Sequence, residues 1–153
     1  MKGTVESADR ETLRRVDLER IDRDHYRARN VRGGVLEFGS GEDEQFTPVE
    51  LLLISIAGCT GMDVDYIVSK RAEPTAVSIT MTGDKIRDES GNRMTNLRIN
   101  LAATFPDGPD GDQARERLPR AVAQSRDRIC TVSRTVSLGT PIETRIVPPA
   151  AQP

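Results

Sequence analysis

A long apolar segment in the middle of the chain places the strongest constraint on the fold. From Leu51 to Cys59 every residue except Ser55 is apolar or small, so a helix here has no polar face to turn toward water. The preceding TPVE, residues 47–50, offers an N-cap threonine, a proline at the first helical position and a glutamate three residues after the cap. The pattern predicts a helix that begins at residue 48, ends near residues 71–72 and is covered on nearly all sides.

Strands are expected on both sides of this helix. Alternating residue types before it predict a small antiparallel meander, and cleaner alternation after it predicts two half-buried strands joined by the hairpin loop DESGN at residues 88–92. The expected strands are residues 13–21, 25–31, 35–38, 75–81 and 97–105, with a closing strand at 139–147.

A second helix is expected after the glycine- and proline-rich break at residues 106–111. Pro119 is expected in its first turn, and the helix should run to about Arg128. Segregated runs of strands and helices indicate an α+β fold. We expect one domain over residues 1–147, built of antiparallel sheets around the buried helix, and a disordered tail at 148–153.

The charge balance argues against nucleic acids and anionic membranes as the main partners. The chain of 153 residues has 22 Lys+Arg against 24 Asp+Glu, so it lacks the strongly basic character that nucleic acids and anionic membranes select. An arginine-rich stretch at residues 10–32 leaves nucleic-acid binding as an alternative, which steeply salt-dependent binding would reveal. No apolar run reaches the length of a membrane span, and MKGTVESADR at the N-terminus has no apolar stretch typical of a signal peptide. We expect a cytoplasmic protein with no membrane or nucleic-acid partner.

Few side chains are available for chemistry. One histidine, His25, and two cysteines are too few for the usual zinc or iron–sulfur sites, and no glycine-rich phosphate-binding motif is present, so no metal or other resident cofactor is expected. We expect His25 to lie on a surface strand.

The two cysteines differ in their sequence surroundings. Cys59 has small neighbours, which leave room for a ligand or another backbone near its sulfur. A simple buried thiol is the alternative. Cys130 follows one helical segment and precedes TVS, so it is expected near a helix N-terminus, where the dipole favours the thiolate. The two can form a redox pair only if the fold brings them together.

Both cysteine segments resemble those of the OsmC/Ohr family. FTPVELLLISIAGCTGMDV, residues 46–64, is similar to the family's cysteine helix, and RAVAQSRDRICTVSRTV, residues 120–136, is similar to its second cysteine segment. The resemblance implies the OsmC-like α+β fold as an intertwined homodimer. It also implies thiol-dependent reduction of hydroperoxides, in which Cys59 forms a sulfenic acid, Cys130 resolves it as a disulfide, and an external dithiol restores both thiols.

The chain departs from the family pattern in the acid and the arginine that act on the reactive thiol. The family peroxidases have a glutamate directly after the helix-starting proline, where this chain has Val49, and the acid follows one residue later as Glu50. Glu50 is therefore a candidate catalytic residue as well as a capping carboxylate. The candidate activating arginines are Arg27, Arg29, Arg32 and Arg134.

Two functions remain open: an OsmC-like peroxidase, and a redox-sensing or apolar-ligand-binding protein with weak or no peroxidase activity. The expected apolar lining near Cys59 consists of Phe46, Leu52, Ile56 and Met62, which would suit a bulky organic hydroperoxide.

Overall fold

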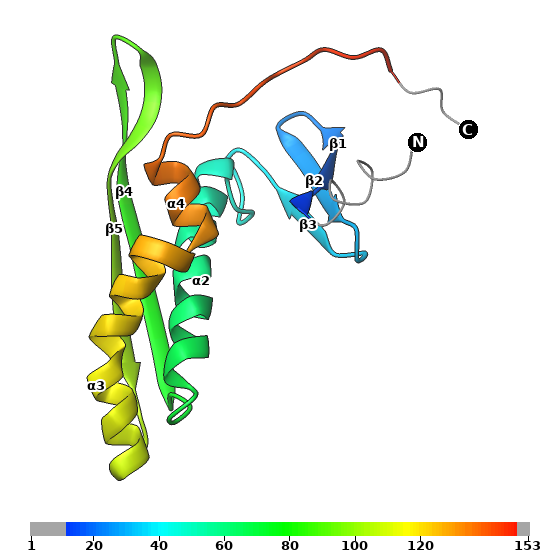
Figure 1. Cartoon of the computed structure of the whole chain (residues 1–153). Coiled ribbons are helices and arrows are strands. Elements are labelled where there is room, and N and C mark those ends of the chain that lie inside the picture. The colour runs from blue at the N-terminus through cyan, green and yellow to red at the C-terminus, as the bar shows by residue number, and fades with distance from the viewer. Residues whose placement is uncertain (1–11, 150–153) are drawn as a thin grey trace, which may run out of the picture. The chain divides into compact units, whose positions relative to one another are not determined.

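A computed structural model describes residues 12–149 of the chain (Figure 1). Its internal contacts divide the chain into two compact units, Met1–Leu52 and Leu53–Pro153. The single domain expected over residues 1–147 stays a prediction. The expected tail at 148–153 lies mostly outside the described residues.

The first unit contains the expected antiparallel meander. Its strands are β1 (Val16–Asp22), β2 (His25–Asn30) and β3 (Val35–Phe38), in the order β1-β2-β3. The turn between β1 and β2 places Asp24 at φ 63°, and the turn between β2 and β3 places Gly33 at φ 88°. Aspartate and glycine tolerate this left-handed backbone better than most residues do, so the turn signals of the sequence translate directly into the meander.

His25 ties the meander to the loop that follows it. Its Nδ1 lies 2.7 Å from Asp22 Oδ1, and its Nε2 lies 2.8 Å from Asp43 Oδ2. The hydrogen bond to Asp43 and then that to Asp22 raise the pKa of His25 above its ordinary value. Its contacts are those of a structural residue at the start of β2.

Helix α2 (Pro48–Val68) begins where the sequence predicts. Thr47 N donates to Glu50 Oε2 at 2.8 Å, and Glu50 N donates to Thr47 Oγ1 at 3.2 Å. This reciprocal pair is a capping box, which satisfies backbone N–H groups that have no partner inside the helix. The helix ends slightly before the predicted residues 71–72.

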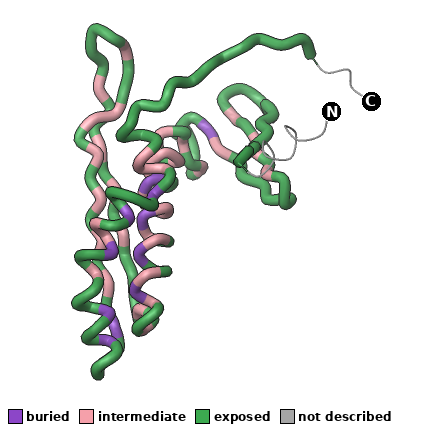
Figure 2. The backbone as a smooth tube through the Cα atoms, viewed as in Figure 1, coloured by how far each residue is buried: buried purple, intermediate pink, exposed green. Residues whose placement is uncertain are grey.

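Only one stripe of α2 is buried within the chain (Figure 2). The buried positions recur every fourth residue: Ile56, Thr60, Val64 and Val68. Other apolar side chains of the helix are exposed, with Ile54 at 47%, Met62 at 76% and Tyr66 at 69%. The prediction that the helix is covered on nearly all sides is therefore wrong for the single chain, because the two-stranded sheet and the helical segments after it pack against only one of its faces.

The second unit is built on the hairpin of β4 (Ala76–Asp88) and β5 (Gly91–Thr104). Both strands were expected, and both are longer than the sequence indicates. Side chains that share a face pair across them, for example Ile79 with Leu101. The hairpin lies alongside α2 and α3 (Figure 1). Leu101 and Ala103, which alternate along β5, pack against the core that these helices share.

Three helical segments follow the hairpin: α3 (Pro109–Gln124), the π-helix η1 (Ser125–Ile129) and α4 (Thr131–Ser137). Pro109 stands in the first turn of α3, and Pro119 lies inside the helix. The predicted start at Pro119 is therefore wrong, because Pro109 already supplies the favoured N-terminal proline. The core joins α2 and α3 through the buried side chains Val64, Val68, Ala114 and Ala121, together with Phe105, which directly follows β5.

The closing strand predicted at residues 139–147 is also wrong. Across the described residues, none after β5 forms a strand. Ile142 and Ile146 are 91% and 102% exposed. The alternation of residue types in this segment is present, but a strand requires a neighbour to pair with and this segment has none in the described structure.

By length and composition alone, α2 would be long and apolar enough to cross a membrane. Its buried stripe instead packs into the core with β5 and α3. This packing is that of the core helix of a soluble protein. The cytoplasmic location stays a prediction.

Candidate active site

The fold of the second unit brings the two cysteines together. Cys59 lies in the middle of α2, and Cys130 lies at the junction between η1 and α4. Their sulfurs and a carboxylate oxygen of Asp63 all lie within 4.8 Å of one another. The proximity that a redox pair requires is therefore met, by segments that are far apart in the sequence.

The backbone at the end of η1 fixes the position of Cys130. Its N–H donates to the Ser125 carbonyl at 2.9 Å, after which the backbone becomes extended, with φ −70° and ψ 99°. Cys130 is the N-cap of α4, and its sulfur accepts from Ser133 N at 3.4 Å. The predicted position at a helix N-terminus is confirmed.

Polar groups surround the Cys130 sulfur, although Cys130 has no exposed surface. The Ser133 hydroxyl lies 3.1 Å away, and the Thr60 hydroxyl lies 3.7 Å away. Burial alone would raise the pKa of this thiol. Hydrogen bonding with the hydroxyl and N–H of Ser133, and then with Cys59 and Thr60, outweighs burial and lowers the pKa of Cys130 below its ordinary value.

The pKa of Cys59 is raised above its ordinary value, and this residue is partly exposed. Burial is the largest cause that raises its pKa, and the neighbouring Cys130 and the Asp63 carboxylate raise it further, while the Val132 N–H partly opposes them. Two coupled thiols lose their protons in two steps that belong to the pair. The hydrogen bonds around Cys130 favour its thiolate, whereas burial of Cys59 favours its protonated thiol.

Asp63 is a site residue that the sequence analysis did not single out. It follows Cys59 by one helical turn, so both side chains project from the same face of α2. The Ser125 hydroxyl donates to Asp63 Oδ2 at 2.9 Å, and Ser125 is completely buried. The cysteine–aspartate spacing of four residues was the available signal. This spacing indicates a site only when Cys130 is known to lie beside it, and the sequence does not show where Cys130 lies relative to α2.

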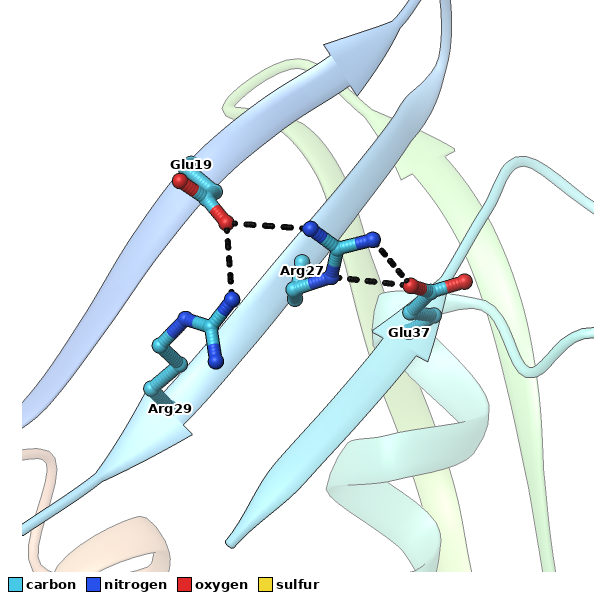
Figure 3. A network of polar contacts seen from close by, with 4 residues as sticks. All are labelled: Glu19, Arg27, Arg29 and Glu37. Atoms are coloured by element: carbon cyan, nitrogen blue, oxygen red, sulfur yellow. Dashed lines mark hydrogen bonds and ion pairs between the residues drawn. The ribbon is translucent and has the colours of Figure 1, made fainter. Parts of the chain in front are cut away.

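Two of the candidate arginines of the first unit, Arg27 and Arg29, are held by carboxylates (Figure 3). Arg27 donates to Glu37 from Nε at 2.8 Å and from Nη2 at 2.6 Å, and also contacts Glu19 at 3.3 Å. Arg29 contacts the same oxygen of Glu19 at 3.3 Å. These contacts link the three strands of the meander, and an activating role for either arginine stays a prediction.

The remaining candidates also have structural contacts. Arg32 donates its backbone N–H to Asn30 Oδ1 at 2.9 Å in the turn after β2. Arg134 donates Nη1 to the Asp127 carbonyl at 2.6 Å, which closes the end of η1. The Glu50 carboxylate takes part in the capping box. Catalytic or activating roles for Arg32, Arg134 and Glu50 stay predictions.

A cavity of about 710 Å³ is lined by two hydroxyl residues that contact Cys130, although neither cysteine lines it. It includes Thr60 and Ser133, which contact Cys130, and most of its other lining is apolar: Ile56, Met81, Leu97, Ile99, Leu101, Val122 and Val136. Of the expected lining residues, only Ile56 contributes. Met62 borders a separate, smaller hollow with Gly58 and Gly61, and Phe46 and Leu52 belong to the first unit.

Comparison with known families identifies the fold. The model of the family described as OsmC-like protein matches residues 41–145, which include both cysteines. The chain belongs to this OsmC-like family. The uncharacterized protein Rv2923c of Mycobacterium tuberculosis is 30% identical over 132 residues, covering 85% of this chain and 93% of that protein. Protein YhfA of Escherichia coli is 27% identical over 100 residues, covering 65% of this chain and 70% of YhfA.

Solved structures show the same fold. A hypothetical protein from Aquifex aeolicus matches this OsmC-like chain with a TM-score of 0.66 and 24% identity, over 84% of this chain and 89% of that one. The organic hydroperoxide resistance protein OsmC from Legionella pneumophila matches with a TM-score of 0.54 and 16% identity, over 81% and 88%. OhrB, the organic hydroperoxide resistance protein of Bacillus subtilis, matches with a TM-score of 0.52 and 14% identity, over 81% of this chain and 90% of that one.

Proposed function

We propose that this OsmC-like protein is a thiol-dependent peroxidase that reduces organic hydroperoxides. The observation that carries the proposal is the pair of thiols from distant segments whose sulfurs lie within 4.8 Å. Two similar structures are those of proteins described by organic hydroperoxide resistance, which supports the same substrate class here. The mostly apolar cavity lined by Thr60 and Ser133, which contact Cys130, can hold the organic part of such a substrate.

Cys59 is the thiol that meets the peroxide. It is partly exposed, whereas Cys130 has no exposed surface. The Cys59 thiolate attacks the terminal oxygen of the hydroperoxide, the O–O bond breaks, and the alkoxide takes a proton and leaves as the alcohol. Cys59 is oxidised to the sulfenic acid and the hydroperoxide is reduced.

Cys130 then resolves the intermediate. Its hydrogen bonds with Ser133 and Thr60 favour the thiolate, which is the form that attacks sulfur. Attack on the Cys59 sulfenic acid forms the Cys59–Cys130 disulfide, and the departing hydroxide takes a proton to give water. An external dithiol then reduces the disulfide. The cycle uses no resident cofactor.

The test of this function is a map of the thiols after one equivalent of cumene hydroperoxide. We expect a Cys59–Cys130 disulfide to form within seconds and to appear in non-reducing peptide mass spectrometry. In Cys130→Ser, which removes the resolving thiol, a dimedone adduct should trap the sulfenic acid at Cys59. If both thiols stay reduced for many minutes in the wild-type protein, the peroxidase assignment is wrong.

A second candidate function is binding of an apolar ligand, and the mostly apolar lining of the 710 Å³ cavity favours it. In that case an environment-sensitive apolar dye would bind the reduced protein, and Leu101→Gln in the cavity wall would weaken the binding. The two functions separate in the peroxide experiment, because ligand binding alone leaves the thiols reduced.

We also propose that the protein is a homodimer in which α2 is covered by a second copy. The support is the exposed apolar surface of this helix, formed by Ile54, Met62 and Tyr66. A surface of this kind on a helix whose other face forms the core is typical of a subunit interface.

The dimer is testable by analytical ultracentrifugation. We expect the wild-type protein to sediment as a dimer and Met62→Glu to sediment mainly as a monomer, because the substitution places a charge in the apolar interface. The control is Asp65→Glu, an exposed position of the same helix where the charge is unchanged. A monomeric wild-type protein would contradict the proposal.

A further inference from the structure

The two thiols and the Asp63 carboxylate form a cluster of three metal-binding side chains. Cys59 and Asp63 project from one face of α2, and Cys130 comes from the start of α4. All three donor atoms lie within 4.8 Å of one another. We propose that the reduced protein binds one zinc ion through Cys59, Asp63 and Cys130, with a fourth position left for water or a small ligand.

The donor set suits zinc. Zinc binds thiolate sulfur at about 2.3 Å and carboxylate oxygen at about 2.0–2.2 Å in tetrahedral geometry, and three protein ligands with one open position are a common arrangement. Two sulfurs on one tetrahedral zinc lie about 3.8 Å apart. The donors therefore need to close by about 1 Å at most, which small rotations of the side chains provide. Magnesium and calcium prefer sets made only of oxygen, so the thiolates select zinc over them.

Neighbouring residues hold the donors ready. The buried Ser125 donates to Oδ2 of Asp63 at 2.9 Å, which orients the carboxylate and leaves its second oxygen available. Ser133 N donates to the Cys130 sulfur at 3.4 Å. Outer contacts of this kind orient the ligands in known metal sites.

The charge of the cluster also favours a cation. When both thiols are ionised, the three donors carry three negative charges in a partly buried space. Among the ion pairs within residues 12–149, none involves Asp63, and the nearby Arg126 is paired with Asp127. A divalent ion would offset most of the mutual repulsion of the donors.

Zinc binding and the proposed peroxidase cycle use the same sulfurs, so they exclude each other. This consequence, unlike zinc binding itself, rests on the proposed function. The two zinc-bound thiolates, one hydroperoxide and two protons give the disulfide, the alcohol, water and free Zn²⁺. The thiolates are oxidised, the hydroperoxide is reduced, and the disulfide no longer provides anionic ligands. Oxidation would thus release the metal.

The test is a metal titration of the full chain, kept metal-free and reduced by a phosphine. Co²⁺ should give the near-ultraviolet thiolate-to-cobalt band and the visible bands of tetrahedral cobalt, saturating at one ion per chain. Addition of Zn²⁺ should displace the cobalt and abolish both the near-ultraviolet band and the visible bands. In competition with a chromophoric chelator, we expect Cys59→Ser and Cys130→Ser to weaken zinc binding on the order of 100-fold and Asp63→Asn about 10- to 100-fold.

The matched control is Asp65→Asn, which removes an exposed carboxylate from the same helix and should leave zinc affinity unchanged within about twofold. A second readout needs no variant: zinc should slow alkylation of Cys59 by iodoacetamide in the wild-type protein. Absence of the thiolate-to-cobalt band, or equal zinc affinity in Asp63→Asn and the wild-type protein, would overturn the three-ligand site. No peroxide is used, so either failure leaves the peroxidase proposal standing.

Discussion

Replacing Cys59 with serine is expected to lower the rate of cumene hydroperoxide consumption on the order of 100-fold or more, because the hydroxyl of serine cannot form the sulfenic acid. Cys130→Ser should behave differently. It keeps Cys59 and therefore consumes about one equivalent of peroxide per chain in a rapid first phase, but it loses steady turnover with a dithiol. Stopped-flow measurement of both variants with the wild-type protein separates the two roles.

The pH dependence of the first-phase rate of peroxide consumption gives a further test, because a purely structural role of Cys59 would not produce it. Burial, the neighbouring Cys130 and Asp63 hold the pKa of Cys59 above its ordinary value. The thiolate is the reactive form, so the first-phase rate should rise with pH into the alkaline range. In Cys130→Ser the neighbouring thiolate is absent, and the rise should move to lower pH. Retained activity in Cys59→Ser together with lost activity in Cys130→Ser would reverse the assignment of roles.

A large loss of stability is expected for Gly111→Ala at the start of α3. A Cβ at this buried glycine would lie 1.8 Å from the Pro106 carbonyl oxygen, which is part of the backbone and cannot rotate away. The chain before α3 or the first turn of the helix must therefore shift. We expect a loss of about 3 kcal/mol or more in the free energy of unfolding, and a decrease of about 10 °C in Tm.

Circular dichroism during heating measures this effect, and Glu116→Ala is the control. Glu116 is exposed on the same helix, and its replacement should change stability by no more than about 0.5 kcal/mol. A Tm for Gly111→Ala equal to that of Glu116→Ala would show that the approach of Pro106 to the helix is not a constraint. Loss of the first turn of α3 would also loosen the segment that leads to Ser125 and Cys130.

The sequence by itself determined the elements whose signals are local. Thr47 and Glu50 satisfy each other's backbone N–H groups, so the start of α2 could be placed to the residue. The meander and the hairpin followed from alternation and from turn residues, and the two cysteine segments indicated the family. Two local predictions failed because a neighbour decided the outcome. Residues 139–147 have no strand to pair with in the described structure, and Pro109 takes the helix start expected of Pro119.

Only the tertiary structure decided how the cysteines are placed and what surrounds them. The distance between Cys59 and Cys130 depends on how α2, the hairpin and α3 pack, and no spacing in the sequence encodes it. The same packing buries Cys130 against Ser133 and Thr60, and sets Asp63 beside both sulfurs with Ser125 behind it. Capping and turn chemistry act between residues close in the chain, whereas the acidity of a thiol depends on charges and hydrogen bonds that reach it through space.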